Sequence, residues 1–175
     1  MRQLRYGVAI SLDGFIATED GGYVWIPEDP EVDAALGEMV QRYDALLMGR
    51  GTYEVVQGAL PFEGMEYYVV STTLDPAEHS DVTIISRDVV ERVSALKQED
   101  GKDIWLFGGG VLFRAMLEAG LVDALEIGLI PRVLGAGIPM LAGLDGVAEL
   151  RPTATRSFET SGIRLIEYEV GRVVG

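Results

Sequence analysis

Residues 104–113 read IWLFGGGVLF and place three consecutive glycines between an apolar run and a segment with helical spacing. This order predicts a buried strand, a tight turn and a helix. Glycine costs about 0.5–1 kcal/mol relative to alanine inside a regular element, so we expect Gly108, Gly109 and Gly110 to serve a purpose. In open α/β sheets ligands bind at such strand ends, where free N–H groups at a helix N-terminus accept a phosphate. A turn without a ligand explains this motif equally well, because the spacing is not GxGxxG.

Apolar runs alternate with helical segments on both sides of this stretch. Strands are expected at residues 4–10, 44–49, 66–71, 81–86, 103–107 and 121–131, and helices at 30–43, 51–59, 87–97 and 109–120. Residues 154–173 alternate with period two across a Ser-Gly turn, which predicts an antiparallel hairpin at a sheet edge. The sequence therefore predicts one α/β domain over residues 1–175, a sandwich with a mostly parallel sheet.

Charge and composition exclude several classes of function. The chain has 175 residues, a net charge of −14, one histidine and no cysteine. Nucleic acids and anionic membranes need a basic surface, so neither is an expected partner. His79 lies in a polar stretch, and without cysteine neither a zinc site nor a histidine triad is expected, so we predict no metal. No apolar run is long enough to span a membrane, and we expect a cytoplasmic protein.

Further strand ends resemble the one at residues 108–110. Residues 46–54, LLMGRGTYE, end a buried strand at Gly49 and continue with Arg50, Gly51 and Thr52. Arg50 can bind a phosphate through its planar fork, and Thr52 can cap a helix and bind the same anion. Two other strand ends carry the pairs Ser71-Thr72 and Ser86-Arg87. Four such ends in an acidic chain predict a long ligand with several phosphates, such as a dinucleotide.

With these motifs in place, nearly the whole chain resembles the dihydrofolate reductase superfamily. It is most similar to the reductase (C-terminal) domain of riboflavin biosynthesis enzymes and its stand-alone bacterial relatives. The similarity is carried by SLDGFIA (11–17), LLMGRGTYE (46–54), VVSTTL (69–74), LFGGGVLFRAML (106–117) and VDALEIGLIPRVLGAGIPML (122–141). It implies a dihydrofolate reductase-like three-layer sandwich, with NADPH as the cofactor of an oxidoreductase.

The resemblance also assigns roles to residues on the cofactor side. Residues 109–112 match the pyrophosphate site, with a cis peptide between Gly108 and Gly109. Ser71, Thr72 and Arg87 match the region that holds the 2′-phosphate, and Ala9 and Ile16 frame the nicotinamide. The full set implied for NADPH is Ala9, Ile16, Gly49, Arg50, Gly51, Thr52, Ser71, Thr72, Ser86, Arg87, Phe107, Gly108, Gly109, Gly110, Val111 and Leu112.

The substrate side departs from the folate reductases. Their acidic residue matches Asp33, which can equally be a first-turn acid that favours the helix dipole. Their threonine matches Gly128, and this loss argues against pterin recognition. Glu126 shares a sheet face with Gly128 and is either a substrate ligand or proton donor, or the partner of an arginine in an ion pair. Trp25 is placed either at a loop that closes the substrate site or in the core.

The resemblance implies hydride transfer from NADPH to a small heterocycle, pyrimidine- or pterin-like, or to a carbonyl or imine group. The proton would come from Asp33, Glu126, a tyrosine or water. Two alternatives stay open, a dihydrofolate reductase and a non-catalytic NADPH-binding or sensing protein. The expected partners are a small-molecule substrate and a second copy of the chain, with the apolar residues 133–144 at the interface of a homodimer.

Overall fold

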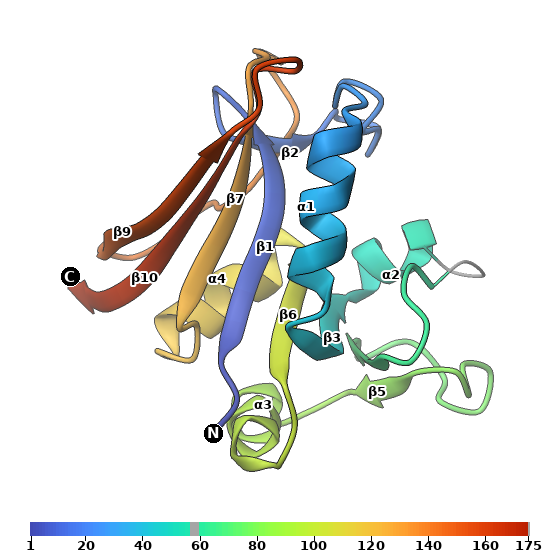
Figure 1. Cartoon of the computed structure of the whole chain (residues 1–175). Coiled ribbons are helices and arrows are strands. Elements are labelled where there is room, and N and C mark those ends of the chain that lie inside the picture. The colour runs from blue at the N-terminus through green and yellow to red at the C-terminus, as the bar shows by residue number, and fades with distance from the viewer. Residues whose placement is uncertain (57–59, 175) are drawn as a thin grey trace.

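An eight-stranded sheet in the order β5-β4-β3-β6-β1-β7-β10-β9 forms the centre of the molecule (Figure 1). The computed structural model describes residues 1–56 and 60–174. The strands are β1 Leu4–Ser11, β3 Tyr43–Gly49, β4 Glu66–Val70, β5 Thr83–Ile85, β6 Asp103–Gly108, β7 Ala124–Ile130, β9 Val147–Ser157 and β10 Arg164–Val174. Pairing is parallel from β5 to β7, and β10 is antiparallel to β7 and β9. The α/β sandwich and its C-terminal antiparallel pair are confirmed.

Helices cover both faces of this sheet. Helices α1 (Pro30–Val40) and α2 (Arg50–Val56) lie on one face, and α3 (Val89–Gln98) and α4 (Gly110–Glu118) lie on the other (Figure 1). Side chains of β3 show the two cores that result, because Leu47 packs with α3 and α4 whereas Met48 packs with Tyr53 of α2. Within residues 1–56 and 60–174, no helix is long and apolar enough to cross a membrane.

Two helix boundaries differ from the expectation. Helix α1 ends at Val40, and Tyr43 is the first residue of β3, although it continues the apolar spacing of the helix. Helix α2 begins at Arg50, so Thr52 is its third residue and the expectation that it caps the helix is wrong. The rest of the helix expected at 51–59 falls partly on residues 57–59, which lie outside the described residues.

A small second sheet pairs β2 (Phe15–Ala17) with β8 (Ile138–Pro139) beside the end of β1. Asp13 fixes this arrangement, because its carboxylate accepts hydrogen bonds from the Ser11 hydroxyl at 2.7 Å and from the N–H groups of Leu134 and Gly135 at 3.1 and 2.7 Å. The loop after β7 is thereby held against the turn after β1.

These hydrogen bonds give Asp13 a measurable signature in the pH dependence of stability. The bond from Ser11, followed by that from Gly135, lowers the pKa of Asp13 to about 2 from its ordinary 3.8. A depressed carboxyl pKa stabilises the fold above the unfolded value and loses that contribution as pH falls toward 2. We therefore expect Asp13→Asn to weaken the fall in stability between pH 5 and pH 2.5, measured by urea unfolding at both values. If the loss of stability between pH 5 and pH 2.5 were the same in Asp13→Asn as in the unaltered protein, the role of Asp13 would be contradicted. Asp145→Asn is the control.

Candidate functional site

The central sheet is open between β1 and β6 at its carboxyl edge. β1 pairs with β6 at three residues, from Leu4 to Tyr6, whereas its pairing with β7 continues to Ser11. The indole N–H of Trp105 donates to the carbonyl of Gly7 at 3.1 Å, so this carbonyl points toward β6. Backbone groups alternate sides along a strand, and those of Ala9 therefore point toward the same opening.

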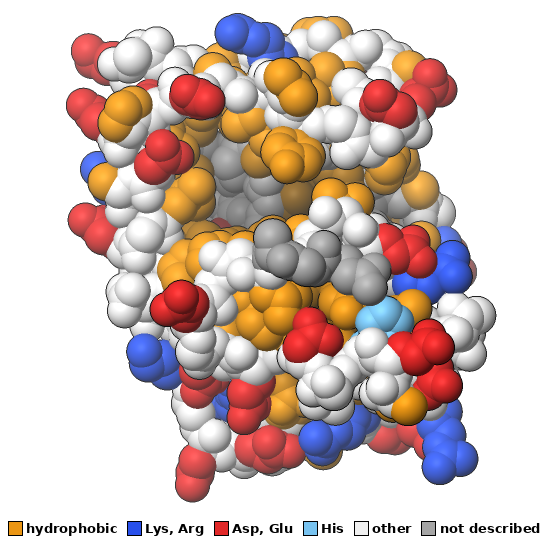
Figure 2. Space-filling model, turned by 90° about the vertical axis from the view of Figure 1, so that its right-hand side faces the viewer, with side chains coloured by type: hydrophobic (Ala, Val, Ile, Leu, Met, Phe, Trp, Pro, Cys, Tyr) orange, Lys and Arg blue, Asp and Glu red, His pale blue; other side chains and the backbone are white. Residues whose placement is uncertain are grey.

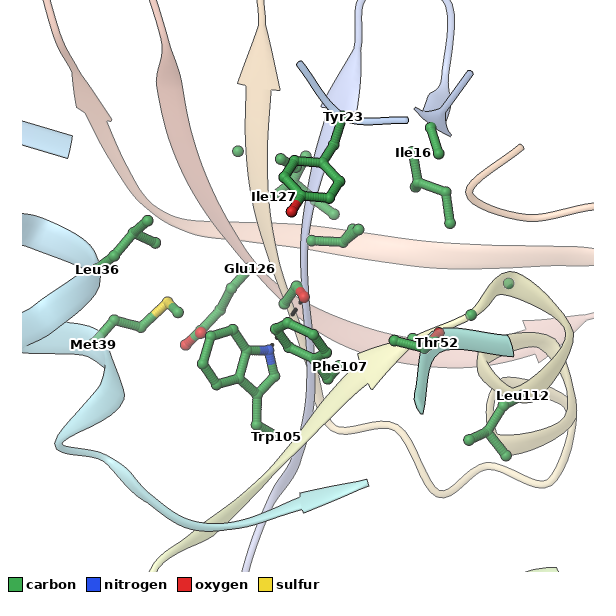
Figure 3. Close-up of a pocket in the computed structure, with 18 of the residues that line it drawn as sticks. Ile16, Tyr23, Leu36, Met39, Thr52, Trp105, Phe107, Leu112, Glu126 and Ile127 are labelled. Atoms are coloured by element: carbon green, nitrogen blue, oxygen red, sulfur yellow. Dashed lines mark hydrogen bonds between the residues drawn. The ribbon is translucent and has the colours of Figure 1, made fainter. Parts of the chain in front are cut away.

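A cavity of about 1480 Å³ extends through this opening. Figure 2 shows it as a hollow in the surface, with hydrophobic side chains gathered at its rim. Figure 3 shows two groups of side chains within it, with Thr52 and Leu112 in one part and Leu36, Met39 and Glu126 in another. We call these parts the phosphate half and the substrate half. Trp105 and Phe107 lie between them (Figure 3).

The phosphate half is built from two strand ends that carry glycine. Gly49 ends β3 and Gly108 ends β6, and both line the cavity. They lie close together, since a Cβ on Gly49 would be 3.8 Å from the backbone N of Gly109. The peptide between Gly108 and Gly109 is cis, as the resemblance implies. Bare backbone and the start of α4 thus face the cavity, an arrangement that suits a phosphate.

Arg50 and Thr52 complete this half from the first turn of α2. Arg50 lines the cavity, is about half exposed, and donates from Nη1 to the hydroxyl of Thr73 at 3.1 Å. Its Nε also lies 3.5 Å from the carboxylate of Glu54. Thr52 lies over the glycine turn, because a Cβ on Gly108 would be 3.3 Å from its Oγ1. Ala9, Ile16, Gly51, Phe107, Val111 and Leu112 also line the cavity.

Packing against the segment around β8 requires glycine at position 110, which the sequence did not reveal. A Cβ at this position would lie 2.7 Å from the carbonyl oxygen of Met140 and 3.0 Å from that of Pro139. Real Cβ atoms essentially never approach a backbone oxygen so closely. The third glycine therefore allows the segment around β8 to lie against the start of α4.

The substrate half has apolar walls and one acidic group in its floor. Leu36 and Met39 of α1 form one wall, and Trp105 and Phe107 of β6 face them (Figure 3). The floor is formed by β1 and β7, where Gly7 pairs with Glu126 and Ala9 pairs with Gly128. Three of these four floor residues have little or no side chain. The room at Gly7 is filled by the indole of Trp105, whose Nε1 would lie 2.5 Å from a Cβ there, and Ala9 and Gly128 leave space at the cavity floor.

Glu126 is buried and holds a network of three partners. Its Oε1 accepts from Nη1 of Arg42 at 2.8 Å and from Nη1 of Arg5 at 3.4 Å. Its Oε2 accepts a hydrogen bond from the hydroxyl of Tyr43. The ion pair that the sequence allowed for is therefore present, and the same carboxylate lines the cavity. A buried charge needs such partners to be tolerated.

Burial also changes the acidity of this network. Loss of solvent raises the pKa of Glu126, although the hydrogen bond from Tyr43 and the charges of Arg42 and Arg5 favour its ionised form. Burial likewise raises the pKa of Tyr43, and the neighbouring charge of Glu126 raises it further. Burial and the three donors therefore act on the pKa of Glu126 in opposite directions, and the effect of burial is the larger.

Two residues predicted for the substrate side lie elsewhere. Asp33 is exposed in the first turn of α1 and lies outside the cavity lining, as expected of a first-turn acid. Trp25 is partly buried against the core cluster that includes Phe158 and Ile163, and its indole N–H donates to Gly22 at 3.3 Å. The same loop reaches the cavity through Tyr23 and Ile26 instead.

The strand ends of β4 and β5 also differ from the expectation. Ser71, Thr72, Ser86 and Arg87 do not line the cavity, although their neighbours Val70, Val89 and Val90 do. Ser71 is buried, and its hydroxyl accepts from the N–H groups of Thr73 and Leu74 within the turn. Thr72, Ser86 and Arg87 are exposed.

Sequence reasoning missed the residues that surround Glu126. Arg42 and Tyr43 are adjacent residues between α1 and the start of β3, and Arg5 lies on β1, so two separate stretches of chain meet Glu126 of β7. The only signal was Glu126 itself, an acidic residue inside an otherwise apolar strand. Such a residue predicts that some partner exists without identifying it.

The chain is similar to a known protein family and to several known proteins. The family described as the RibD C-terminal domain matches residues 2–163. The uncharacterized protein YwjB of Bacillus subtilis (strain 168) is 35% identical over 155 residues, covering 86% of this chain and 89% of its own. A putative riboflavin biosynthesis protein from Shewanella sp. PV-4 has a TM-score of 0.83 at 25% identity, with 97% of this chain and 99% of that chain covered.

A more distant solved structure shares the fold. Dihydrofolate reductase from Enterococcus faecalis, complexed with NADP(H) and RAB-propyl, has a TM-score of 0.68. It is 18% identical, and the alignment covers 99% of this chain and 97% of that chain. At this identity the likeness concerns the arrangement of helices and strands.

Proposed function

Since the chain belongs to the family of the RibD C-terminal domain, we propose that it is an NADPH-dependent reductase. Its substrate would be a small heterocycle, pyrimidine- or pterin-like, or a carbonyl or imine compound. The observation that carries the proposal is the single cavity that joins a glycine-lined phosphate half to a substrate half across the opening between β1 and β6. A ligand long enough to fill it would lie across this opening.

The residues of the phosphate half fit a dinucleotide phosphate. Gly49 and residues 108–110 leave the backbone bare, Thr52 offers a hydroxyl, and Arg50 offers a guanidinium group. The acidic residues that line the cavity, among those the structure describes, are Glu38, Glu126 and Glu167, and they belong to α1, β7 and β10 on the substrate side. An anion in the phosphate half would therefore meet donors and no cavity-lining carboxylate.

In this proposal the protein positions the reactants and supplies a proton. NADPH, when bound, supplies the hydride. The backbone of Ala9 would orient the reactive ring at the opening, and the walls formed by Met39, Trp105 and Phe107 would exclude water. Glu126 is the cavity-lining acid nearest this opening, opposite Gly7, and we assign it rather than Asp33 to proton donation.

The two alternatives are separated by different observations. Gly128 replaces the threonine of folate reductases, and Asp33 is exposed outside the cavity, so neither residue supports dihydrofolate reduction. A non-catalytic NADPH-binding protein would need the phosphate half alone. That role would be indicated by tight cofactor binding without cofactor oxidation across a panel of heterocycles, carbonyl compounds and imines.

We expect the chain to bind NADPH more tightly than NADH, and Arg50→Ala to weaken NADPH binding about ten- to hundredfold, since hydrogen bonds to charged groups contribute about 1.5–3 kcal/mol. Isothermal titration calorimetry of both cofactors against both proteins measures this directly. Arg151→Ala is the matched control, because Arg151 is exposed on β9 and pairs with Glu169 away from the cavity.

Two outcomes would count against the proposal. Absence of NADPH binding to the unaltered protein would remove the cofactor and the reductase together. Equal losses in Arg50→Ala and Arg151→Ala would show a general charge effect in place of a phosphate contact. Arg87→Ala tests the remaining expectation for the 2′-phosphate, and a selective loss of NADPH over NADH would restore that residue to the site.

A further inference from the structure

We infer that the substrate half selects an uncharged planar molecule and discriminates against a phosphorylated one. This inference rests on the proposed reductase function and specifies its class of substrate. It comes from the contrast between the carboxylates of the two halves: among the described residues, three glutamates line the substrate half, whereas the partner of Arg50 in the phosphate half, Glu54, lies outside the cavity lining.

Arg42 is the first cation of the substrate half, and it is held between two carboxylates. Its Nη1 lies 2.8 Å from Oε1 of Glu126, and its Nη2 lies 2.9 Å from Oε1 of Glu167. All three residues line the cavity. Glu126 and Glu167 are register partners on β7 and β10, so the sheet itself fixes the two carboxylates that receive the guanidinium group.

Arg156 of β9 is the second cation, and it is also engaged. Its Nη1 lies 3.7 Å from the carboxylate of Glu38 on α1, and its guanidinium lies 4.9 Å from the ring centre of Phe158. Two arginines and three glutamates therefore line this half, among the residues that the structure describes, with Arg5 behind Glu126. A phosphate placed there would face three carboxylates, and at Arg42 it would have to displace one of the two that the sheet holds in place, which is unfavourable.

The walls of the substrate half favour a flat ring. Trp105 forms an edge contact with Phe107, with ring centres 5.1 Å apart, and stacks on Phe62 at 5.3 Å. Leu36 and Met39 lie across the cavity from Trp105 and Phe107 (Figure 3). Trp105 also stacks on Tyr43 at 5.3 Å and is buried, so it supports this wall from behind. Phe107 on one side and Leu36 and Met39 on the other are more exposed, and they offer contact area to a planar molecule without requiring charge.

Riboflavin and flavin mononucleotide provide a direct test, because they share one ring system and differ by one phosphate. Both are titrated with the protein in saturating NADP⁺, which occupies the phosphate half and prevents turnover. Flavin fluorescence anisotropy gives both values of Kd. We expect the phosphorylated flavin to bind about tenfold more weakly or worse. Equal affinity, tighter binding of the phosphorylated flavin, or no binding of either would overturn the inference.

A charge-neutralising variant tests the cause of the discrimination. Glu167→Gln leaves Arg42 with one carboxylate, so we expect the preference for riboflavin to fall about three- to tenfold. Glu169→Gln is the matched control, because Glu169 lies two residues further along β10 and pairs with Arg151 outside the cavity. An equal change in both variants, or no change in Glu167→Gln, would contradict the proposed role of paired charges.

The two proposals can fail separately. NADP⁺ binding is measured first by calorimetry, and its absence would count against the reductase. The Kd values of riboflavin and flavin mononucleotide are then measured without cofactor. The ratio of the two values in Glu167→Gln is compared with the ratio in Glu169→Gln. Cofactor binding together with a preference for the phosphorylated flavin would leave the reductase in place and overturn the substrate class.

Discussion

Glu126→Ala is expected to lower the free energy of unfolding by about 3–5 kcal/mol, since removal of one member of a buried ion pair leaves its partners uncompensated. The alanine variant would leave Arg5, Arg42 and the hydroxyl of Tyr43 without the acceptor that now joins them. Urea unfolding followed by tryptophan fluorescence measures this loss, and Trp105 lies beside the network and reports on it locally.

Glu126→Gln separates charge from hydrogen bonding. Glutamine keeps an oxygen that can accept from Tyr43, so we expect a smaller loss of about 1–3 kcal/mol. Glu169→Ala is the control, since Glu169 is exposed and an exposed pair contributes about 0–1 kcal/mol. If Glu126→Ala cost no more than Glu169→Ala, the network would not support the fold. If the glutamine variant were stable and bound NADPH but could not reduce any substrate, Glu126 would keep its assignment as proton donor.

Gly110→Ala is expected to destabilise the fold by about 1–3 kcal/mol and to weaken NADPH binding more than Arg50→Ala does. The new Cβ would meet the carbonyl oxygens of Met140 and Pro139, and backbone cannot rotate away as a side chain can. Either α4 or the segment around β8 must shift, and the start of α4 lines the phosphate half. Thermal unfolding and calorimetry with NADPH measure the two effects.

Gly37→Ala is the matched control for this substitution. Gly37 lies inside α1, and a Cβ there would meet open space. Alanine is the better helix former, so this variant should be as stable as the unaltered protein or gain up to about 1 kcal/mol. A Gly110→Ala variant that was equally stable and bound NADPH normally would show that the β8 segment moves aside at little cost.

Much of the fold was predictable because its signals are local. Apolar runs separated by helical spacing give the order of strands and helices, and the period-two tail gives the hairpin. The family resemblance, confirmed by the match over residues 2–163, implied the three-layer sandwich. The order of the strands in the sheet was not predicted, because periodicity does not determine it. The end of α1 was misplaced because Tyr43 continues the helical spacing without a glycine or proline to mark the stop.

The site was predictable only where consecutive residues form it. Residues 49–52 and 107–112 lie on two strand-to-helix turns, and all of them line the cavity. That they bind a cofactor stays a prediction. Two readings of Asp33 stayed open because a match in position does not determine which face of a helix points inward; Asp33 is an exposed first-turn acid, and Val32 and Leu36 line the cavity instead. The partners of Glu126 come from segments far apart in the chain. The homodimer and the cytoplasmic location stay predictions.

The early end of the β1–β6 pairing leaves a short connection between the two parts of the sheet. β5, β4, β3 and β6 form one block, and β1, β7, β10 and β9 form another, with three register pairs joining them. Leu4 to Tyr6 is the stretch of β1 at which the two blocks are joined, and beyond it they separate toward the carboxyl edge of the sheet. A ligand that spans the opening would contact both blocks. Its contacts would then add to the backbone hydrogen bonds that hold the two parts of the sheet together.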